Sequence, residues 1–148
     1  MKKKVKRGTS WRQTIFYPFF DASHYGRGTV LRCPVTVDKY DSREFCDIPY
    51  LEAVGVYNEE KKETVVFAVN RNLKEAINLE AEIAGLGSAR LIEHRLLANS
   101  DLYACNSAAA EKVKPVITGT GRIENKSGSI RLEISLPPAS WNVIRLIP

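Results

Sequence analysis

The stretch SIRLEISL at residues 129–136 is the most regular part of this 148-residue sequence. Ile130, Leu132, Ile134 and Leu136 alternate there with polar side chains. Because successive side chains of a β-strand point to opposite faces, this alternation predicts a strand with one face buried and the other in water. The same period of two extends over most of the chain after residue 28, so we expect a body built from strands.

Other segments with the composition of strands are separated by turns that contain Gly, Pro or Asn. We expect these strands at residues 30–37, 51–57, 64–70, 77–83, 89–97 and 141–147, with more extended chain after Pro115. Pro34 marks the first of them as an edge strand or a bulge, since proline has no N–H to donate to a neighbouring strand. Residues 58–62 are a charged connection of hairpin length. Residues 38–49 are expected to be a polar loop, and residues 99–114 a long loop in which residues 106–110 could hold a short helical turn.

Strands and helices do not alternate in this body, so a parallel sheet crossed by helices is not expected. About seven or more strands separated by frequent turns favour an all-β fold, a two-sheet β-sandwich that is jelly-roll-like or of Greek-key kind.

Residues 11–25 differ from the body because they are rich in aromatic side chains. Large apolar side chains recur there at the offsets of a helical face, which predicts a helix over residues 17–25. Pro18 fits the first turn of such a helix, and Gly26 suits its end. So many large apolar side chains on one short helix imply a partner surface for them to cover.

The composition, 44% hydrophobic and 26% charged, is that of a globular protein. The formal net charge is +5, but residues 2–7 alone contribute five Lys and Arg side chains. The remainder is formally neutral and lacks the basic stripe of a nucleic-acid-binding fold. We expect residues 1–10 to be a disordered basic leader. Apolar runs are far shorter than the roughly 18 residues of a membrane span, so neither nucleic acid nor a membrane is expected as a partner.

The start of the chain does not match an export signal, because Arg12 and Gln13 interrupt the apolar stretch that a signal peptide needs. Cys33, Cys46 and Cys105 are odd in number and widely spaced, which is not the pattern of a disulfide framework or a zinc site. We therefore expect a cytoplasmic chain in which each cysteine is a small buried apolar side chain.

Glu59, Glu60 and Glu63 form an acidic cluster. Paired carboxylates are the machinery of glycoside hydrolysis, but these lie in or beside a lysine-containing turn, where solvated charge is the ordinary expectation. Arrangements of Ser, His and Asp stay open, because such sites are assembled in space and not along the sequence. The residues alone indicate no catalytic site.

Acidic residues also recur every three positions in the predicted loop, at Asp38, Asp41, Glu44 and Asp47. The loop lacks the glycine and the alternating ligand spacing of an EF-hand. We therefore expect no calcium ion in this loop.

Blocks of sequence at several places carry a resemblance to a known family. They are residues 11–19, 22–23, 25–28, 39–41, 49–52, 67–71, Asn106 with the alanines after it, and 140–146. In their order and spacing they resemble the C-terminal part of glycoside hydrolase family fifty-one, which consists mainly of α-L-arabinofuranosidases. The resemblance covers nearly everything after Ser10.

The resemblance implies a parent enzyme that removes terminal α-L-arabinofuranosyl residues from arabinan or arabinoxylan with retention, and that needs neither a metal ion nor an organic cofactor. In that family two catalytic glutamates stand about 5 Å apart on strands of a (β/α)8 barrel. Those strands would precede this segment, so we expect a fragment without activity of its own. Residues 11–27 would be a remnant of the last barrel segment and its helix, and residues 28–148 a C-terminal β-sandwich with an accessory, structural role. The partner implied is the catalytic barrel.

One site residue is implied by the resemblance. The glutamine of the family's Trp-Arg-Gln-Thr block, which contacts the sugar, matches Gln13. An amide suits this role because it offers both a donor and an acceptor to neighbouring hydroxyls. In a chain without a barrel, we expect Gln13 to be exposed and without a pocket.

Two other functions stay open: a stand-alone carbohydrate-binding module and a protein-interaction module. In the first, exposed aromatic rings would stack on an arabinose-containing oligosaccharide, although core packing is the expected fate of most of the candidates. These candidates are Trp11, Tyr40, Tyr50 and Tyr103. In the second, the surface of residues 11–25 would bind another protein or a second copy in a homo-oligomer.

Overall fold

The computed structural model describes residues 9–148. The basic leader expected at residues 1–10 lies almost entirely outside the described residues, so its disorder stays a prediction. The elements are α1 (Phe16–Tyr25), β1 (Thr29–Leu31), β2 (Lys39–Tyr40), β3 (Ile48–Pro49), β4 (Leu51–Asn58), β5 (Glu63–Asn70), β6 (Ile77–Ala84), β7 (Arg90–Leu97), β8 (Val116–Thr118), β9 (Arg122–Lys126), β10 (Ser129–Leu136) and β11 (Ser140–Ile147).

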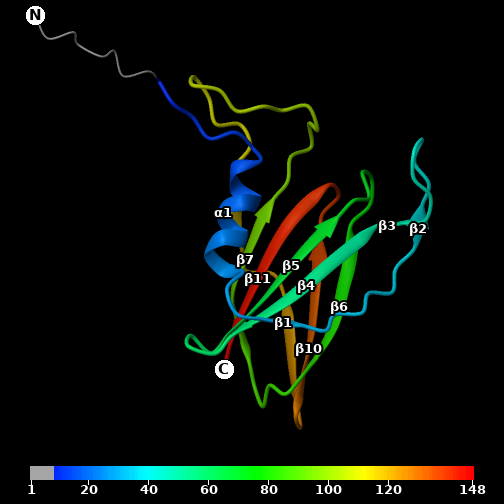
Figure 1. Cartoon of the computed structure of the whole chain (residues 1–148), viewed down its shortest axis with the longest axis vertical. Helices are drawn as coiled ribbons and strands as arrows, with labels where there is room; N and C mark the ends of the chain where they lie inside the picture. The colour runs from blue at the N-terminus through cyan, green and yellow to red at the C-terminus, as the bar shows by residue number, and fades with distance from the viewer. Residues whose placement is uncertain (1–8) are drawn as a thin grey trace, which may run out of the picture.

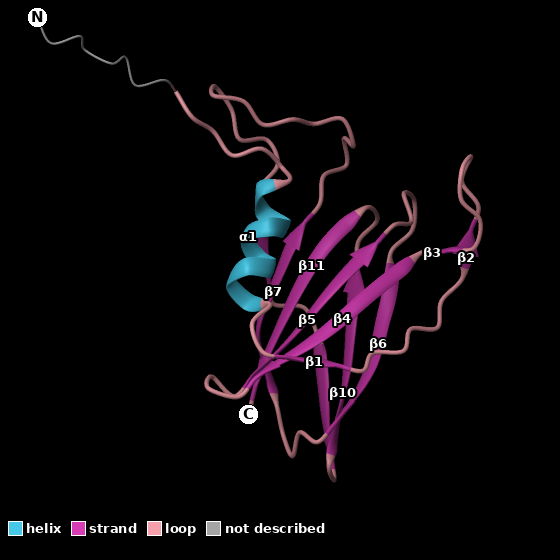
Figure 2. Ribbon diagram, viewed as in Figure 1, coloured by secondary structure: helices cyan, strands magenta, loops and turns pink. Residues whose placement is uncertain are grey.

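Apart from the short pair of β2 and β3, the strands form two packed sheets, as predicted. One sheet has six strands in the order β1-β4-β5-β11-β7-β8, and the other has three in the order β6-β10-β9. All strand pairs of the described residues are antiparallel. Helix α1 lies along the outer face of the larger sheet, beside β7 and β11 (Figures 1 and 2). The fold is therefore an all-β sandwich with one N-terminal helix, which confirms the predicted class.

The main core lies between the two sheets and contains the apolar side chains that alternate along residues 129–136. Ile130, Leu132, Ile134 and Leu136 of β10 are all buried there, while Arg131 on the same strand is only half-buried. Side chains of the larger sheet meet them from the opposite side: Leu51, Val66, Ala68, Ile144 and Leu146. Burial of this apolar surface is the main force that holds the two sheets together.

A second, smaller core lies on the outer face, under α1. Val65 and Phe67 of the central strand β5 contribute to it, with the half-buried Tyr25 at the end of the helix. Strand β5 thus buries both of its faces, which accounts for its nearly continuous apolar sequence. The larger sheet is sandwiched between a helix and a second sheet.

Three segments differ from the predictions. The strand expected at residues 30–37 is only the three-residue β1, because Pro34 lacks the N–H that would extend the ladder. The predicted polar loop at residues 38–49 contains the short antiparallel pair of β2 and β3. Residues 106–110 form bends and not a helical turn.

The prediction that the cysteines are buried is wrong. Cys33, Cys46 and Cys105 are exposed and free, because each lies in a connection between strands and not on a core-facing strand position. Within residues 9–148, helix α1 is too short to cross a membrane.

Candidate functional site at the helix and its attachment to the sheet

Gln13, the residue singled out by resemblance, lies just before α1 and is exposed. Its backbone carbonyl accepts a hydrogen bond of 3.0 Å from the Phe16 N–H, and the Thr14 carbonyl accepts one of 3.3 Å from Tyr17. These bonds form the first turn, so the position of Gln13 is coupled to that of the helix.

The loop of residues 99–114 holds the segment that carries Gln13. The buried amide of Asn106 donates to the carbonyl oxygen of Arg12 at 2.9 Å and to that of Val113 at 2.7 Å. Its Oδ1 accepts the N–H of Val113 at 2.8 Å. Asn106 therefore closes the loop on itself and ties it to a residue 94 positions earlier.

A second contact joins the same loop to the helix. The hydroxyl of Tyr17 donates to the carboxylate of Glu111. Burial, and then the hydrogen bond to Glu111, raise the pKa of Tyr17 to about 12. The hydroxyl therefore keeps its proton and remains a donor at neutral pH.

An open groove of about 450 Å³ separates the two segments. It is lined by residues 10–12 on one side and 106–111 on the other. Gln13 is not among its lining residues, so the structure does not place that side chain in a pocket.

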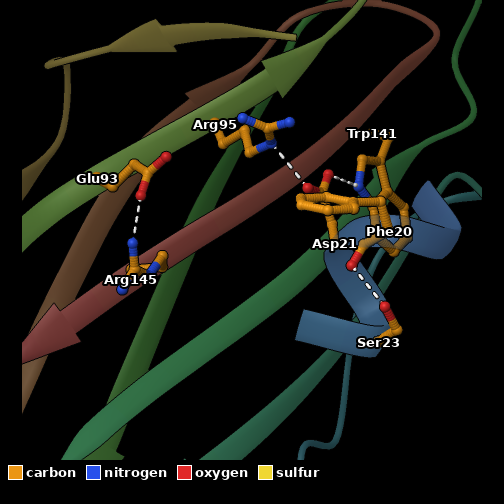
Figure 3. A network of polar contacts seen from close by, with 7 residues as sticks. All are labelled: Phe20, Asp21, Ser23, Glu93, Arg95, Trp141 and Arg145. Atoms are coloured by element: carbon orange, nitrogen blue, oxygen red, sulfur yellow. Dashed lines mark hydrogen bonds and ion pairs between the residues drawn. The ribbon is translucent and has the colours of Figure 1, made fainter. Parts of the chain in front are cut away.

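Farther along the helix, Asp21 is fully buried against the sheet (Figure 3). One carboxylate oxygen accepts the Nε–H of Arg95 at 2.7 Å, and the other accepts the indole N–H of Trp141 at 3.1 Å. Burial raises the pKa of Asp21, although the bonds from Trp141 and Arg95 oppose that rise. One helical side chain is thus fixed to both β7 and β11.

A second polar group on this face surrounds Arg145. Its guanidinium donates to Glu63 on one side and to Glu93 on the other, and it lies 4.5 Å from the ring centre of Tyr25 (Figure 3 shows Glu93). Burial alone would lower the pKa of Arg145, but the bonds to the two carboxylates outweigh it and raise the pKa.

The expectation that Glu63 is solvated is therefore wrong: it is 4% exposed. The pairing of β5 with β11 brings Arg145 to the same face, 82 residues away in sequence. Glu59 and Glu60, in the turn that precedes it, are exposed as expected.

This arrangement suits attachment better than bond breaking. A retaining glycosidase needs two carboxyl groups about 5–5.5 Å apart with the sugar between them. Between Glu63 and Glu93 stands the guanidinium of Arg145, which forms an ion pair with each of them. Among residues 9–148 no cluster of three or more His, Cys, Asp and Glu side chains could hold a metal ion.

The candidate sugar-stacking rings have different fates. Trp11 is 50% and Tyr103 93% exposed, so core packing does not account for these two. Tyr40 and Tyr50 are half-buried and stack on each other, with ring centres 4.7 Å apart.

Comparison with known proteins adds an independent finding. The family model described as "Alpha-L-arabinofuranosidase C-terminal domain" matches residues 2–140. An intracellular exo-alpha-(1->5)-L-arabinofuranosidase of Halalkalibacterium halodurans is 40% identical over 141 residues, which cover 95% of this chain and 27% of that protein. A protein of the same name from Acetivibrio thermocellus is 42% identical over 139 residues, 94% of this chain and 27% of that protein.

A solved structure agrees in fold with the whole arrangement. AbfB, a family 51 alpha-L-arabinofuranosidase from Bifidobacterium longum, superimposes with a TM-score of 0.79 at 29% identity. The match covers 93% of this chain and 26% of that one. The chain thus spans about a quarter of the length of the proteins that it matches.

Proposed function

The chain belongs to the family of alpha-L-arabinofuranosidase C-terminal domains, and from this premise we propose that it is the accessory part of an arabinofuranosidase and supports a catalytic barrel. The barrel is its partner and carries both catalytic glutamates. The chain itself breaks no glycosidic bond and binds no cofactor.

For the whole enzyme we propose hydrolysis of terminal α-L-arabinofuranosyl residues of arabinan or arabinoxylan with retention, inside the cytoplasm. Names of the relatives support arabinofuranose as the sugar and an intracellular location. The choice of polymer rests on the resemblance alone.

The observation that carries this proposal is the two-sided nature of α1. One side of the helix is fixed to the sheet through Asp21. Elsewhere on the helix, Phe19 is 71% exposed, and Ile15, just before the first helical residue, is 64% exposed. Large apolar side chains gathered on a short helix indicate a surface for another protein part. We propose that residues 11–27 are the last segment of the barrel and that these side chains face it.

The test compares the chain with a chimera. In the chimera, the full 148 residues replace the matching segment of the Halalkalibacterium halodurans enzyme. With a chromogenic arabinofuranoside, the isolated chain should release no product, whereas the chimera should approach the parent enzyme. Turnover by the isolated chain would contradict the accessory role, and an inactive chimera would contradict the pairing with the barrel.

A carbohydrate-binding role is the second candidate, because Trp11 and Tyr103 offer exposed rings that could stack on a sugar. Titration of the isolated chain with arabinan and arabinoxylan oligosaccharides separates the two functions. Saturable binding that is lost in Tyr103→Ala would favour the second. If the chain has only the accessory role, we expect no saturable binding.

A further inference from the structure

We propose that Asn106 is a positioning residue for Gln13. Through its bond to the Arg12 carbonyl, it would hold the glutamine where the amide meets the sugar. The inference rests on the proposed function of the whole enzyme and on the resemblance, which implies that Gln13 contacts the arabinofuranosyl unit. Asn106 itself touches no substrate.

The first step is that both N–H donors of the Asn106 amide are already used. The side chain is 8% exposed, its nitrogen donates to two carbonyls and its oxygen accepts one N–H. The two bonds to Val113 already close the loop. The bond to Arg12 is therefore the one that reaches outside the loop.

The second step is that this bond acts next to Gln13. The Arg12 carbonyl belongs to the peptide group that contains the Gln13 nitrogen. On its other side, the Gln13 carbonyl is held by the Phe16 N–H at 3.0 Å. Both peptide groups of Gln13 are thus fixed, while its side chain remains exposed and free to meet a ligand.

The third step is that the loop keeps its place without this bond. The contact of Tyr17 with Glu111 independently ties the loop to α1. Losing the Arg12 bond should therefore release the Gln13 backbone by a small amount and leave the loop attached. Small displacements matter, because a shift of about 1 Å in a substrate-binding group can cost roughly 100-fold in rate.

The experiment uses the full chain in the chimera described above. Asn106→Asp keeps the shape and the acceptor for the Val113 N–H but loses both donors, to the Arg12 and the Val113 carbonyls. Asn106→Ser is shorter and adds no charge. Asn99→Ala is the matched control, since Asn99 lies in the same loop but bonds to Lys112 and Asp101.

We expect kcat/KM for a chromogenic arabinofuranoside to fall about 10- to 100-fold in both Asn106 variants, mainly through KM, and to stay within about twofold in Asn99→Ala. The decisive readout is a double-mutant cycle. Once Gln13→Ala is present, the change at Asn106 should have almost no further effect, because the group that it positions is gone.

Additive losses in the cycle would overturn the inference, as would equal kinetics for the Asn106 and Asn99 variants. Failure of both Asn106 variants to fold would assign the residue a purely structural role and would also overturn it. An inactive wild-type chimera is a different result, since it contradicts the proposed function first.

Discussion

The two faces of the six-stranded sheet contact their neighbours through different kinds of interaction. The inner face meets β10 through aliphatic side chains such as Leu132 and Ile144, which are fully buried. On the outer face, a smaller apolar core is joined by polar contacts: the buried carboxylate of Asp21 fixes the helix, and Arg145 joins two carboxylates beside it.

This difference indicates how each face of the sheet selects the element that packs on it. Apolar packing is non-directional, and similar side chains of the same total volume can replace one another at modest cost. A buried carboxylate is costly unless its donors are in place, so it tolerates few arrangements of the helix on the sheet. We expect the inner face to supply most of the stability and the outer face to set the placement of α1.

Leu132→Ala tests the inner face and should have the largest effect. The side chain is fully buried in the core between the sheets, so we expect a loss of about 3–5 kcal/mol in the free energy of unfolding. Urea denaturation measures it. Val116→Ala on the edge strand β8, where the side chain is 48% exposed, is the control and should change little. Similar losses at both positions would show that this core does not dominate.

Asp21→Ala tests the outer face. It leaves Arg95 and Trp141 without their acceptor, and we expect a loss of about 2–4 kcal/mol, limited because the Arg95 side chain is 20% exposed. Trp141 fluorescence should change as well. Glu52→Ala breaks the exposed ion pair with Arg71 and should cost only about 0–1 kcal/mol. If Asp21→Ala and Glu52→Ala lost the same free energy of unfolding, the buried contacts of Asp21 would not be what holds the helix on the sheet.

Periodicity predicted the parts of this molecule in which local sequence and burial agree. The strand of residues 129–136 and the hairpin of β4 and β5 are where alternation and turn chemistry placed them. Helix α1 begins within a residue of its predicted start. In the predicted strand of residues 30–37, one proline outweighed favourable neighbours, because it has no N–H to donate to a ladder.

The polar network could not be predicted, because its members are far apart in the chain. Asp21 and Trp141 are 120 residues apart. In the sequence, Glu63 lies beside a charged turn, and only the pairing of β5 with β11 shows that Arg145 is its partner. For the site, resemblance supplied Gln13, whose contact with a sugar stays a prediction. Asn106 lay within a block that resembles the family, and this was the only sequence signal for its role.

His94 is a polar side chain on the inner face, which is otherwise mainly aliphatic, so it offers a further test of how that face is stabilised. It is 1% exposed, and its ring lies 2.9 Å from Asn142 Oδ1 and 2.7 Å from Thr118 Oγ1. Burial lowers the pKa of His94, and the bond to Asn142 opposes this only in part. The folded state thus holds the neutral ring below pH 6.5, where the unfolded state binds a proton.

The contribution of His94 is therefore complete above about pH 6.5 and is lost as the pH falls toward its folded-state pKa, by at most about 1.4 kcal/mol per pH unit. Urea denaturation between pH 7 and pH 5 should show a steeper loss of stability in the wild type than in His94→Gln. His24→Gln, at an exposed position, should keep the wild-type slope. Equal slopes in all three proteins would mean that His94 is not buried in its neutral form.

The smallest effect is expected on the solvent side of the three-stranded sheet, where Arg131 pairs with Glu80 across β10 and β6 at 2.8 Å. The side chains of Arg131 and Glu80 are 39% and 55% exposed, so water and salt screen their attraction. Glu80→Gln should lower the free energy of unfolding by about 0–1 kcal/mol, and that difference should disappear in about 1 M salt. Glu80 differs from Asp21 in exposure more than in chemistry. A loss at Glu80 as large as that of Asp21→Ala would therefore show that burial is not what makes the outer-face pairs specific.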